Sequence, residues 1–520
     1  MTTGSWQRQP ALAALAFLTS CAVLILLRPL LPVDETRYLT VAWEMWNGGS
    51  YVVPHLNGEV YSHKPPLLFW IINLVWAVTG PSEIAARMVG PLAGAVAILL
   101  TARLARALWP GEADRPGQAA WVLATTGVFA AFGSATMFDT LLTVATLWAM
   151  LALWTMARRY SWGAVLALGA ALAFGVLAKG PVILVHVLPV ALTLSLWRPD
   201  PAGTSTPAFL RGVGLSILVA LALVGLWLGP ALVFGDAGYR NDILWRQSAG
   251  RMMASFDHAR PVWVFVALLP LYLWPWGWGR EVLGPWRRPA VSQVRFLGIW
   301  AAAALIGFSF VSGKQIHYLL PELAALAMLL SGPVTAAIGR WQRLMPMVPA
   351  VLLLGAAVAV VAGLIAPEAV DNHGIGLVEL AVAAGVVAVG MALVVAAPDR
   401  LRARLPVVPA TLVAVQVLAY QTLWNGNDPA RMASLLAAHA GAGVASTDTL
   451  YAGQFSYVAR LAEPVQVLRE AGALEVWMAG HPGGLLIART PVEAAGLTLL
   501  LQEVFHDDPW YAYEVGSVSP

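Results

Sequence analysis

The sequence predicts an all-α polytopic membrane protein with a small α/β domain at its C-terminus. Of its 520 residues, 59% are hydrophobic and only 11% are charged, whereas soluble globular proteins carry roughly 25% charged residues. Apolar runs of about 20 residues, long enough to cross a bilayer, recur along residues 1–424, and charged residues become frequent only after them. Composition therefore excludes a soluble globular protein.

Thirteen segments are candidates to span the membrane. The first, at 10–31, is longer than the roughly 7–15-residue apolar core of a signal peptide, and no small-residue cleavage site follows it. We therefore expect it to be a retained span. The thirteen segments are centred near residues 20, 95, 127, 147, 170, 189, 223, 270, 304, 328, 355, 387 and 414.

The basic residues orient this predicted bundle. Arginines recur in alternate connections, and the positive-inside rule places those connections in the cytoplasm together with Arg8 and the N-terminus. The other connections then face outward, and these include the stretch 33–70 and everything after about residue 423.

Lysine is scarce, and its positions are informative. Of the 31 basic residues only three are lysines, and each lies on the predicted outer side at a membrane boundary. They are Lys64, Lys179 and Lys314. Five arginines also lie on that side, against the positive-inside trend: Arg37, Arg240, Arg246, Arg251 and Arg260. Together they indicate an anionic ligand, and ordinary loop charges at the interface are the alternative for any one of them.

The stretch 33–70 concentrates ionisable groups beside the membrane, which usually indicates a functional role. It begins with the adjacent carboxylates Asp34 and Glu35 and ends with His63 and Lys64 before a Pro-Pro pair.

Two juxtamembrane helices are predicted within and just after this stretch. Apolar residues recur at i, i+3, i+4, i+7 and i+8 over 34–47, which predicts a helix lying flat in the interface. The apolar run at 65–78 has about 14 residues and is too short to span. We expect both helices to form a platform over the bundle.

The composition divides the chain into two domains. After the last predicted span charges return, and the runs GVASTD, PVQVL and GLLIAR resemble short strands that alternate with helical pieces. We predict a transmembrane domain over 1–424, with its first outer loop at 33–80, and a soluble α/β domain over 425–520.

Seven short sequence motifs occur in order along the chain: DETRY, HKPPLLFW, FDT, LAKGP, QSAGRMMASFDHARP, LPLYLWPW and GKQIHYLLP. Together they resemble the aminoarabinose transferase branch of lipid-to-lipid glycosyltransferases, relatives of the protein O-mannosyltransferases with the GT-C fold. The resemblance covers residues 30–325 strongly and the remainder in layout only. It implies a multi-pass protein of the bacterial inner membrane whose active site and C-terminal domain are periplasmic.

The resemblance also implies a function. The expected enzyme moves a sugar, with inversion, from an undecaprenyl phosphate donor to lipid A, another envelope lipid or a glycan, and protein O-mannosylation is the alternative within the enzyme class. A transporter is the rival class. It would show charges near the bilayer midplane and broken helices in repeated halves, whereas the charges here gather at one face. No nucleic-acid partner is expected.

The acidic residues of the motifs DETRY and FDT have expected roles. Asp34 matches the first-loop aspartate of the family and is the expected base for the acceptor proton. Asp139 would bind acceptor or metal, or shift the pKa of Asp34 by proximity. Helix capping is the alternative for both residues. Glu35 is expected to orient Arg37 or a water molecule. Glu35 and Arg37 are therefore predicted to be supporting residues of the site.

Cationic and hydroxyl groups are expected to hold the donor phosphate, because ammonium groups suit phosphate and stabilise the charge of a leaving group. The candidates are Lys64, Lys179, Arg246, Arg251, Lys314 and Tyr318, with Gln247 in a supporting role. An ordinary interfacial tyrosine is the alternative for Tyr318.

A divalent metal is the one cofactor that the resemblance suggests. The family commonly has a Glu residue before the lysine of the KPP motif, and that residue is associated with a metal site. This chain has His63 at that position. His63 and His258 are the candidate ligands for zinc, magnesium or manganese, although two histidines far apart in the sequence are a sparse ligand set.

Overall fold

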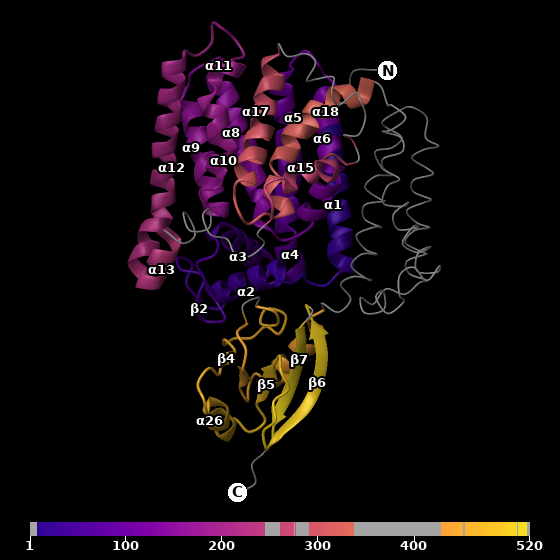
Figure 1. Ribbon diagram of the computed structural model, residues 1–520, viewed down its shortest axis with the longest axis vertical. Coiled ribbons are helices and arrows are strands. Elements are labelled where there is room, and N and C mark those ends of the chain that lie inside the picture. Colours follow the sequence, from indigo (N-terminus) through magenta and orange to yellow (C-terminus); the bar gives the residue numbers. More distant parts are fainter. Residues whose placement is uncertain are drawn as a thin grey trace, which may run out of the picture.

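The computed structural model describes residues 8–244, 260–274, 276, 291–336, 428–450, 453–506 and 508–516. Long helices stand side by side as a bundle, short helices cross one end of it, and a β-sheet lies beyond them (Figure 1). The predicted spans near residues 355, 387 and 414 lie outside the described residues.

Six helices in the described part of the chain are long and apolar enough to cross a membrane. They are α1 (Gln9–Leu27), α4 and α5 taken together (Glu83–Leu108), α8 (Phe138–Arg158), α9 (Trp162–Lys179), α12 (Thr206–Phe234) and α17 (Ser292–Ser309). They correspond to the predicted spans near residues 20, 95, 147, 170, 223 and 304.

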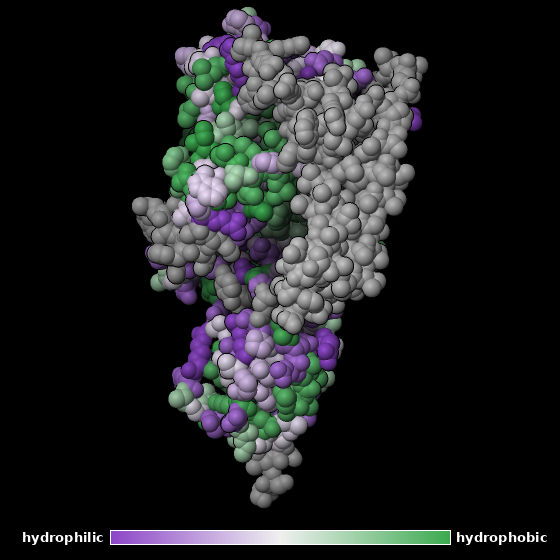
Figure 2. Space-filling view, turned by 45° about the vertical axis from the view of Figure 1, so that its right-hand side comes forward, coloured by the Kyte–Doolittle hydropathy of each residue, from purple (hydrophilic) through white to green (hydrophobic). Residues whose placement is uncertain are grey.

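The burial of these helices separates central from peripheral positions. The apolar window of α8 is 78% buried, whereas that of α12 is 22% buried. On α12, Leu218, Leu221 and Leu226 are each more than 60% exposed, which fits a helix that faces lipid. Hydrophobic side chains gather over the visible face of the bundle, and hydrophilic ones over the adjoining part of the C-terminal domain (Figure 2).

The other predicted spans within the described residues are shorter or interrupted. The segments near 127, 189, 270 and 328 contain α6 (Arg115–Ala124) and α7 (Gly127–Gly133), α10 (Ile183–Leu192) and α11 (Leu194–Trp197), α15 (Val264–Ala267) and α16 (Leu269–Leu273), and α18 (Glu322–Ala336). Between α6 and α7, the hydroxyls of Thr125 and Thr126 donate to carbonyls one turn back. Hydropathy alone does not reveal this interruption.

The two juxtamembrane helices lie close to where the sequence places them. They are α2 (Asp34–Trp46) and α3 (Leu67–Thr79), and a short hairpin of β1 (His55–Leu56) and β2 (Glu59–Val60) lies between them. We call α2, the hairpin and α3 the platform. The apolar face of α2 packs in one cluster with Leu68, Phe69 and Ile72 of α3, and Figure 1 shows both helices across the end of the bundle.

Buried charges join the platform to the bundle. The Glu35 carboxylate accepts both terminal N–H groups of Arg28, the backbone N–H of Leu31 at 3.0 Å and that of Thr136 at 2.9 Å. Arg87 lies 4.0 Å from the same carboxylate. Burial opposes ionisation of Glu35, but the charges of Arg28 and Arg87 and these hydrogen bonds lower its pKa to about 2.

We expect Glu35→Gln to destabilise the protein by about 3–5 kcal/mol, because it leaves the buried guanidinium of Arg28 without its counter-charge. Because the pKa of Glu35 is lowered from 4.5 to about 2, its contribution is present above pH 4.5 and is lost as the pH falls toward 2. Thermal unfolding in nanodiscs at several pH values measures both effects. Glu83→Gln is the matched control, since Glu83 pairs with Arg87 while 36% exposed and should change stability by less than about 1 kcal/mol. Equal losses in the two variants would contradict this account.

The C-terminal domain is built on a five-stranded sheet of order β4-β3-β5-β7-β6. Its elements are α25 (Ala430–His439), β3 (Val444–Ser446), β4 (Gln466–Val467), α26 (Ala473–Gly480), β5 (Leu485–Ala488), β6 (Leu497–Phe505) and β7 (Asp508–Val515). β3 pairs in parallel with β4 and β5, and β7 is antiparallel to β5 and β6. The runs GVASTD, PVQVL and GLLIAR contain β3, β4 and β5.

The C-terminal domain docks on the polar face of α2. Thr40 donates to the carbonyl of Gly453 at 2.9 Å, and Trp43 to that of Leu461 at 2.7 Å. Asn57 and Val465 exchange two hydrogen bonds, of 3.0 and 2.9 Å. The face of α2 that periodicity assigns to water is therefore covered by the domain, and Thr40 is fully buried.

Gly453→Ala is expected to loosen this docking. A Cβ there would lie 2.8 Å from the Cβ of Thr40, and φ is +55°. Limited trypsin digestion should cut after Arg460 at least several-fold faster, because Arg460 is pinned by a hydrogen bond to Pro81 on the platform side. Gly472→Ala is the control, since its φ is +80° but nothing lies within 4 Å of the added Cβ. Cleavage that is no faster in Gly453→Ala than in this control would contradict the packing argument.

Candidate active site

Polar side chains from five separate segments meet where the bundle adjoins the platform. They come from the start of α2, the residue before the Pro-Pro pair, the start of α8, the end of α9 and the short helix η5 (Ile316–Leu319). Electrostatic interactions connect them, because Asp34, Lys64, Asp139 and Lys179 all act on the imidazole of His317. We call these residues the charged cluster: Asp34, Lys64, Asp139, Lys179, His317 and Tyr318.

Asp139 and Lys179 form the centre of the cluster. The Lys179 ammonium lies 2.5 Å from Asp139 Oδ1, and the Asp139 side chain is 3% exposed. Because α8 begins where α9 ends, an acid in the first turn of one helix meets a base in the last turn of the other. The carboxylate of Asp139 is thus engaged by Lys179, while Met137 occupies the N-cap position of α8. The same ammonium lies 5.0 Å from the ring centroid of Tyr318.

Asp34 is partly exposed and begins α2, whose N-cap is Val33 without a side-chain hydrogen bond. Its carboxylate is instead hydrogen-bonded to the hydroxyl of Tyr38. Burial, followed by the charge of Asp34, raises the pKa of Tyr38 well above 10, so the phenol stays protonated and donates. The Tyr38 ring packs edge-on against Phe138 at 4.8 Å, which fixes the start of α2 beside the start of α8.

Lys64, a member of the cluster, and the preceding residue His63 are both half-buried. The Lys64 ammonium lies 5.9 Å from the ring centroid of Phe138, next to Asp139. Two prolines follow Lys64 and restrict the backbone there. The His63 imidazole stacks on Tyr61 with the ring centroids 5.4 Å apart.

The metal prediction gains no support within the described residues, which contain no group of three or more His, Cys, Asp or Glu side chains able to hold a metal ion. His258 lies outside them. His63 with its stacked tyrosine does not by itself make a ligand set for a divalent ion.

Three further residues predicted for the site, Lys314, Glu35 and Arg37, are buried in the protein. The Lys314 ammonium is buried and donates to the carbonyls of Val311 at 2.5 Å and Arg260 at 2.8 Å, and burial lowers its pKa. Glu35 was expected to orient Arg37 or water, but it is 1% exposed and pairs with two other arginines instead. Arg37 is itself buried. Arg246, Gln247 and Arg251 lie outside the described residues.

His317 belongs to the cluster although the sequence reading gave it no role. Burial lowers its pKa to about 4, while the charges of Asp139 and Lys179 act in opposite directions. The imidazole is therefore neutral at pH 7 and can both donate and accept a hydrogen bond. Its position in the motif GKQIHYLLP, between the predicted site residues Lys314 and Tyr318, is the sequence signal that points to it.

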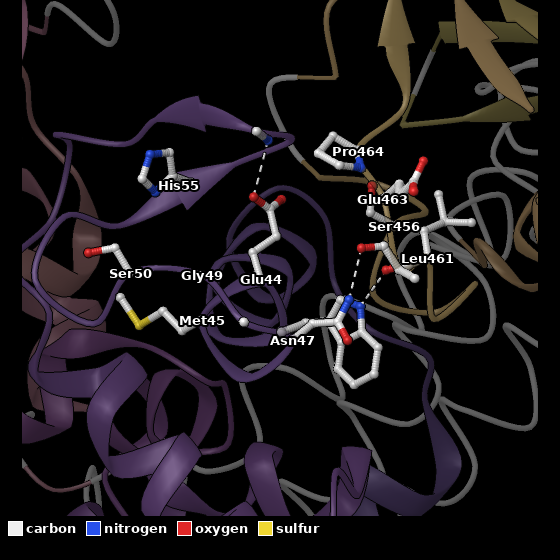
Figure 3. Close-up of a pocket in the computed structure, with 14 residues that line it drawn as sticks. Glu44, Met45, Asn47, Gly49, Ser50, His55, Ser456, Leu461, Glu463 and Pro464 are labelled. Carbon is white, nitrogen blue, oxygen red and sulfur yellow. Dashed lines mark hydrogen bonds between the residues drawn. The ribbon is translucent and has the colours of Figure 1, made fainter.

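A separate pocket lies at the other end of α2, against the C-terminal domain (Figure 3). Its volume is about 350 Å³. It is lined by Trp43, Glu44, Met45, Asn47, Gly48, Gly49, Ser50, His55, Gly58, Ser456, Leu461, Ala462, Glu463 and Pro464. Glu44 accepts the backbone N–H groups of Asn57 and Gly58, and Asp34 lies about 15 Å away along the helix. Because these lining residues include no Lys or Arg, the pocket is not suited to phosphate.

The spanning bundle, the platform and the charged cluster together define an integral-membrane protein with the GT-C fold. The structure matches the crystal structure of ArnT from Cupriavidus metallidurans bound to undecaprenyl phosphate, with a TM-score of 0.77, 19% identity and 100% of both chains covered. It also matches the apo state of that protein, with a TM-score of 0.74 over 96% of both chains and 19% identity.

Sequence comparisons point to the same group of proteins. Residues 63–227 match the family described as dolichyl-phosphate-mannose-protein mannosyltransferase. The undecaprenyl phosphate-alpha-4-amino-4-deoxy-L-arabinose arabinosyl transferase 1 of Pseudomonas fluorescens (strain Pf0-1) is 28% identical over 57% of this chain and 52% of its own length. The corresponding transferase of Pseudomonas aeruginosa (strain UCBPP-PA14) is 30% identical over 57% and 54%. The chain thus spans about half the length of the curated relatives it matches, and the resemblance to aminoarabinose-transferase-like GT-C glycosyltransferases is confirmed.

Proposed function

We propose that this protein is an inverting glycosyltransferase of the bacterial inner membrane. It moves a sugar from an undecaprenyl phosphate donor to lipid A, another envelope lipid or a glycan at the periplasmic face. The observation that carries the proposal is the charged cluster, which gathers two carboxylates and two ammonium groups between the bundle and the platform. The two Pseudomonas relatives described above are arabinosyl transferases named for undecaprenyl phosphate, which supports the same donor class.

The cations of the cluster would hold the donor phosphate. Lys64 comes from the segment just before α3 and Lys179 from the end of α9, and Tyr318 can add a hydroxyl hydrogen bond. An incoming phosphate would share Lys179 with Asp139. As the bond between the sugar and the phosphate breaks, negative charge on the leaving phosphate grows, and fixed ammonium groups stabilise that charge. Arg246 and Arg251 remain predicted contributors to the same group, whereas the contacts of Lys314 favour a role in anchoring the loop before η5.

Asp34 would act as the base. The acceptor hydroxyl attacks the anomeric carbon from the side opposite the phosphate, its proton passes to the Asp34 carboxylate, and undecaprenyl phosphate leaves with the bonding electron pair. The partial exposure of Asp34 leaves a path for the acceptor, and the hydrogen bond from Tyr38 holds the carboxylate in place. Asp139 and neutral His317 would complete the acceptor side.

A panel of substrates tests the proposal. Purified protein in nanodiscs is incubated with undecaprenyl phosphates carrying different sugars and with envelope lipids, glycans or peptides, and mass spectrometry follows donor and acceptor. Release of undecaprenyl phosphate with a matching mass gain on a lipid or glycan supports the proposal. A mass gain on a peptide identifies protein O-mannosylation instead. Donor binding without release from any donor would contradict a transferase.

A further inference from the structure

A buried acid–imidazole pair lies inside the bundle, outside the charged cluster. Nδ1 of His186, on α10, is 2.6 Å from Oε1 of Glu322, the first residue of α18. The indole N–H of Trp300, on α17, donates to the same oxygen at 3.1 Å. His186 is 0% exposed and Glu322 is 3% exposed. One carboxylate oxygen therefore joins three helices.

Stability alone does not account for this arrangement. His186 Nε2 and Glu322 Oε2 have no hydrogen-bond partner among the described residues, and unpaired polar atoms in apolar surroundings are costly. Replacing a buried ionisable pair by apolar side chains of similar volume is often neutral or stabilising. An ionisable pair inside a membrane bundle therefore indicates a functional role.

The pair lies between two segments that supply the charged cluster. α10 follows directly after the turn that ends α9 at Lys179, and α18 follows directly after η5, which holds Tyr318. The Phe308 ring of α17 bridges the pair and the cluster, with its centroid 5.3 Å from that of His186 and 5.8 Å from that of Tyr318. A continuous packed path thus runs from Glu322 to the ring beside the Lys179 ammonium.

We propose that His186, Trp300 and Glu322 form a positioning triad that fixes η5 against the end of α9. The triad would keep His317 and Tyr318 beside Lys179 without touching the substrate. The proposal rests on the function proposed above for its effect on transfer, but its structural effect does not depend on that function. Positioning requires the hydrogen bonds of Glu322 Oε1 rather than its charge.

Two substitutions at one position separate hydrogen bonding from charge. Glu322→Gln keeps an oxygen that can accept from Trp300 and from the Nδ1–H tautomer of His186, whereas Glu322→Leu removes the acceptor at similar volume. The first readout is hydrogen exchange of the segment 313–322 in nanodiscs. Two backbone hydrogen bonds of η5, from Tyr318 N–H to Gln315 and from Leu320 N–H to His317, report its local opening.

We expect exchange of this segment to become at least tenfold faster in Glu322→Leu and to stay within threefold of the parent in Glu322→Gln. The turnover number should fall at least tenfold in Glu322→Leu, with a smaller change in donor KM. Ser216→Ala is the matched control, because it removes another buried hydrogen bond between helices, from α12 to α9, and should change neither readout.

Each outcome decides the proposal. Parent-like exchange in Glu322→Leu overturns it, and so does equal loss of turnover in the Gln and Leu variants, which would assign Glu322 a charge or proton-transfer role. If Glu322→Leu does not fold, Trp300→Phe removes a single donor from the triad, and unchanged exchange in that variant overturns the proposal. If the parent protein transfers no sugar from any donor, the proposed function fails, while the exchange data still decide the triad.

Discussion

Asp34→Asn is expected to slow sugar transfer by about 10²–10⁴-fold, the usual contribution of a general base, while donor binding stays within a few-fold of the parent. The amide has the size of the carboxylate and can still accept the hydrogen bond from Tyr38, but it cannot take the acceptor proton. Single-turnover transfer in nanodiscs, followed by mass spectrometry, measures the rate. Binding of undecaprenyl phosphate is measured on the same preparation.

Glu44→Gln is the matched control, because it makes the same chemical change on the same helix, beside the pocket at the C-terminal domain. We expect it to transfer sugar at nearly the parental rate. Parental transfer by Asp34→Asn would remove Asp34 from the role of base. Loss of donor binding together with transfer would indicate instead that Asp34 organises the site.

Lys64→Ala is expected to weaken undecaprenyl phosphate binding by about 10- to 100-fold, because a hydrogen bond to a charged group contributes about 1.5–3 kcal/mol. Transfer should fall further, since the ammonium also stabilises the charge of the leaving phosphate. Native mass spectrometry or intrinsic tryptophan fluorescence measures the binding. Raising the salt concentration should weaken undecaprenyl phosphate binding more in the parent than in Lys64→Ala, because salt screens the contact between the ammonium and the phosphate.

Lys314→Met is the control for Lys64, because the donors of Lys314 are given to backbone carbonyls. It should lower thermal stability while changing phosphate affinity less than threefold. Similar losses of undecaprenyl phosphate affinity in the two variants would show that Lys314 also binds the donor phosphate. Unchanged affinity in Lys64→Ala would contradict the placement of the donor phosphate in the charged cluster.

The sequence predicted the parts of this fold that depend on local pattern. Periodicity and length were sufficient for α2 and α3, because an amphipathic face and a short apolar run are properties of consecutive residues. Hydropathy located the long spans for the same reason. It did not locate the break between α6 and α7 at Thr125 and Thr126.

Contacts between distant segments could not be predicted in this way. The scarcity of lysine singled out Lys64 and Lys314 equally, and only the fold separates an ammonium in the charged cluster from one held by backbone carbonyls. The partners of Glu35 are Arg28, directly after α1, and Arg87, the last residue of α4, and no spacing within DETRY points to them. His317 needed the fold as well, because its environment is made by four other segments.

The central claim is that sugar transfer, rather than lipid transport, occurs at the charged cluster. The most direct test reconstitutes the protein in liposomes with a labelled undecaprenyl phosphate sugar in one leaflet, and counts released undecaprenyl phosphate against sugar gained by the acceptor. The account predicts one undecaprenyl phosphate for each sugar transferred by the parent, and background levels of both for Asp34→Asn. Intact donor that appears in the opposite leaflet, with no sugar on the acceptor and no effect of Asp34→Asn, would contradict it.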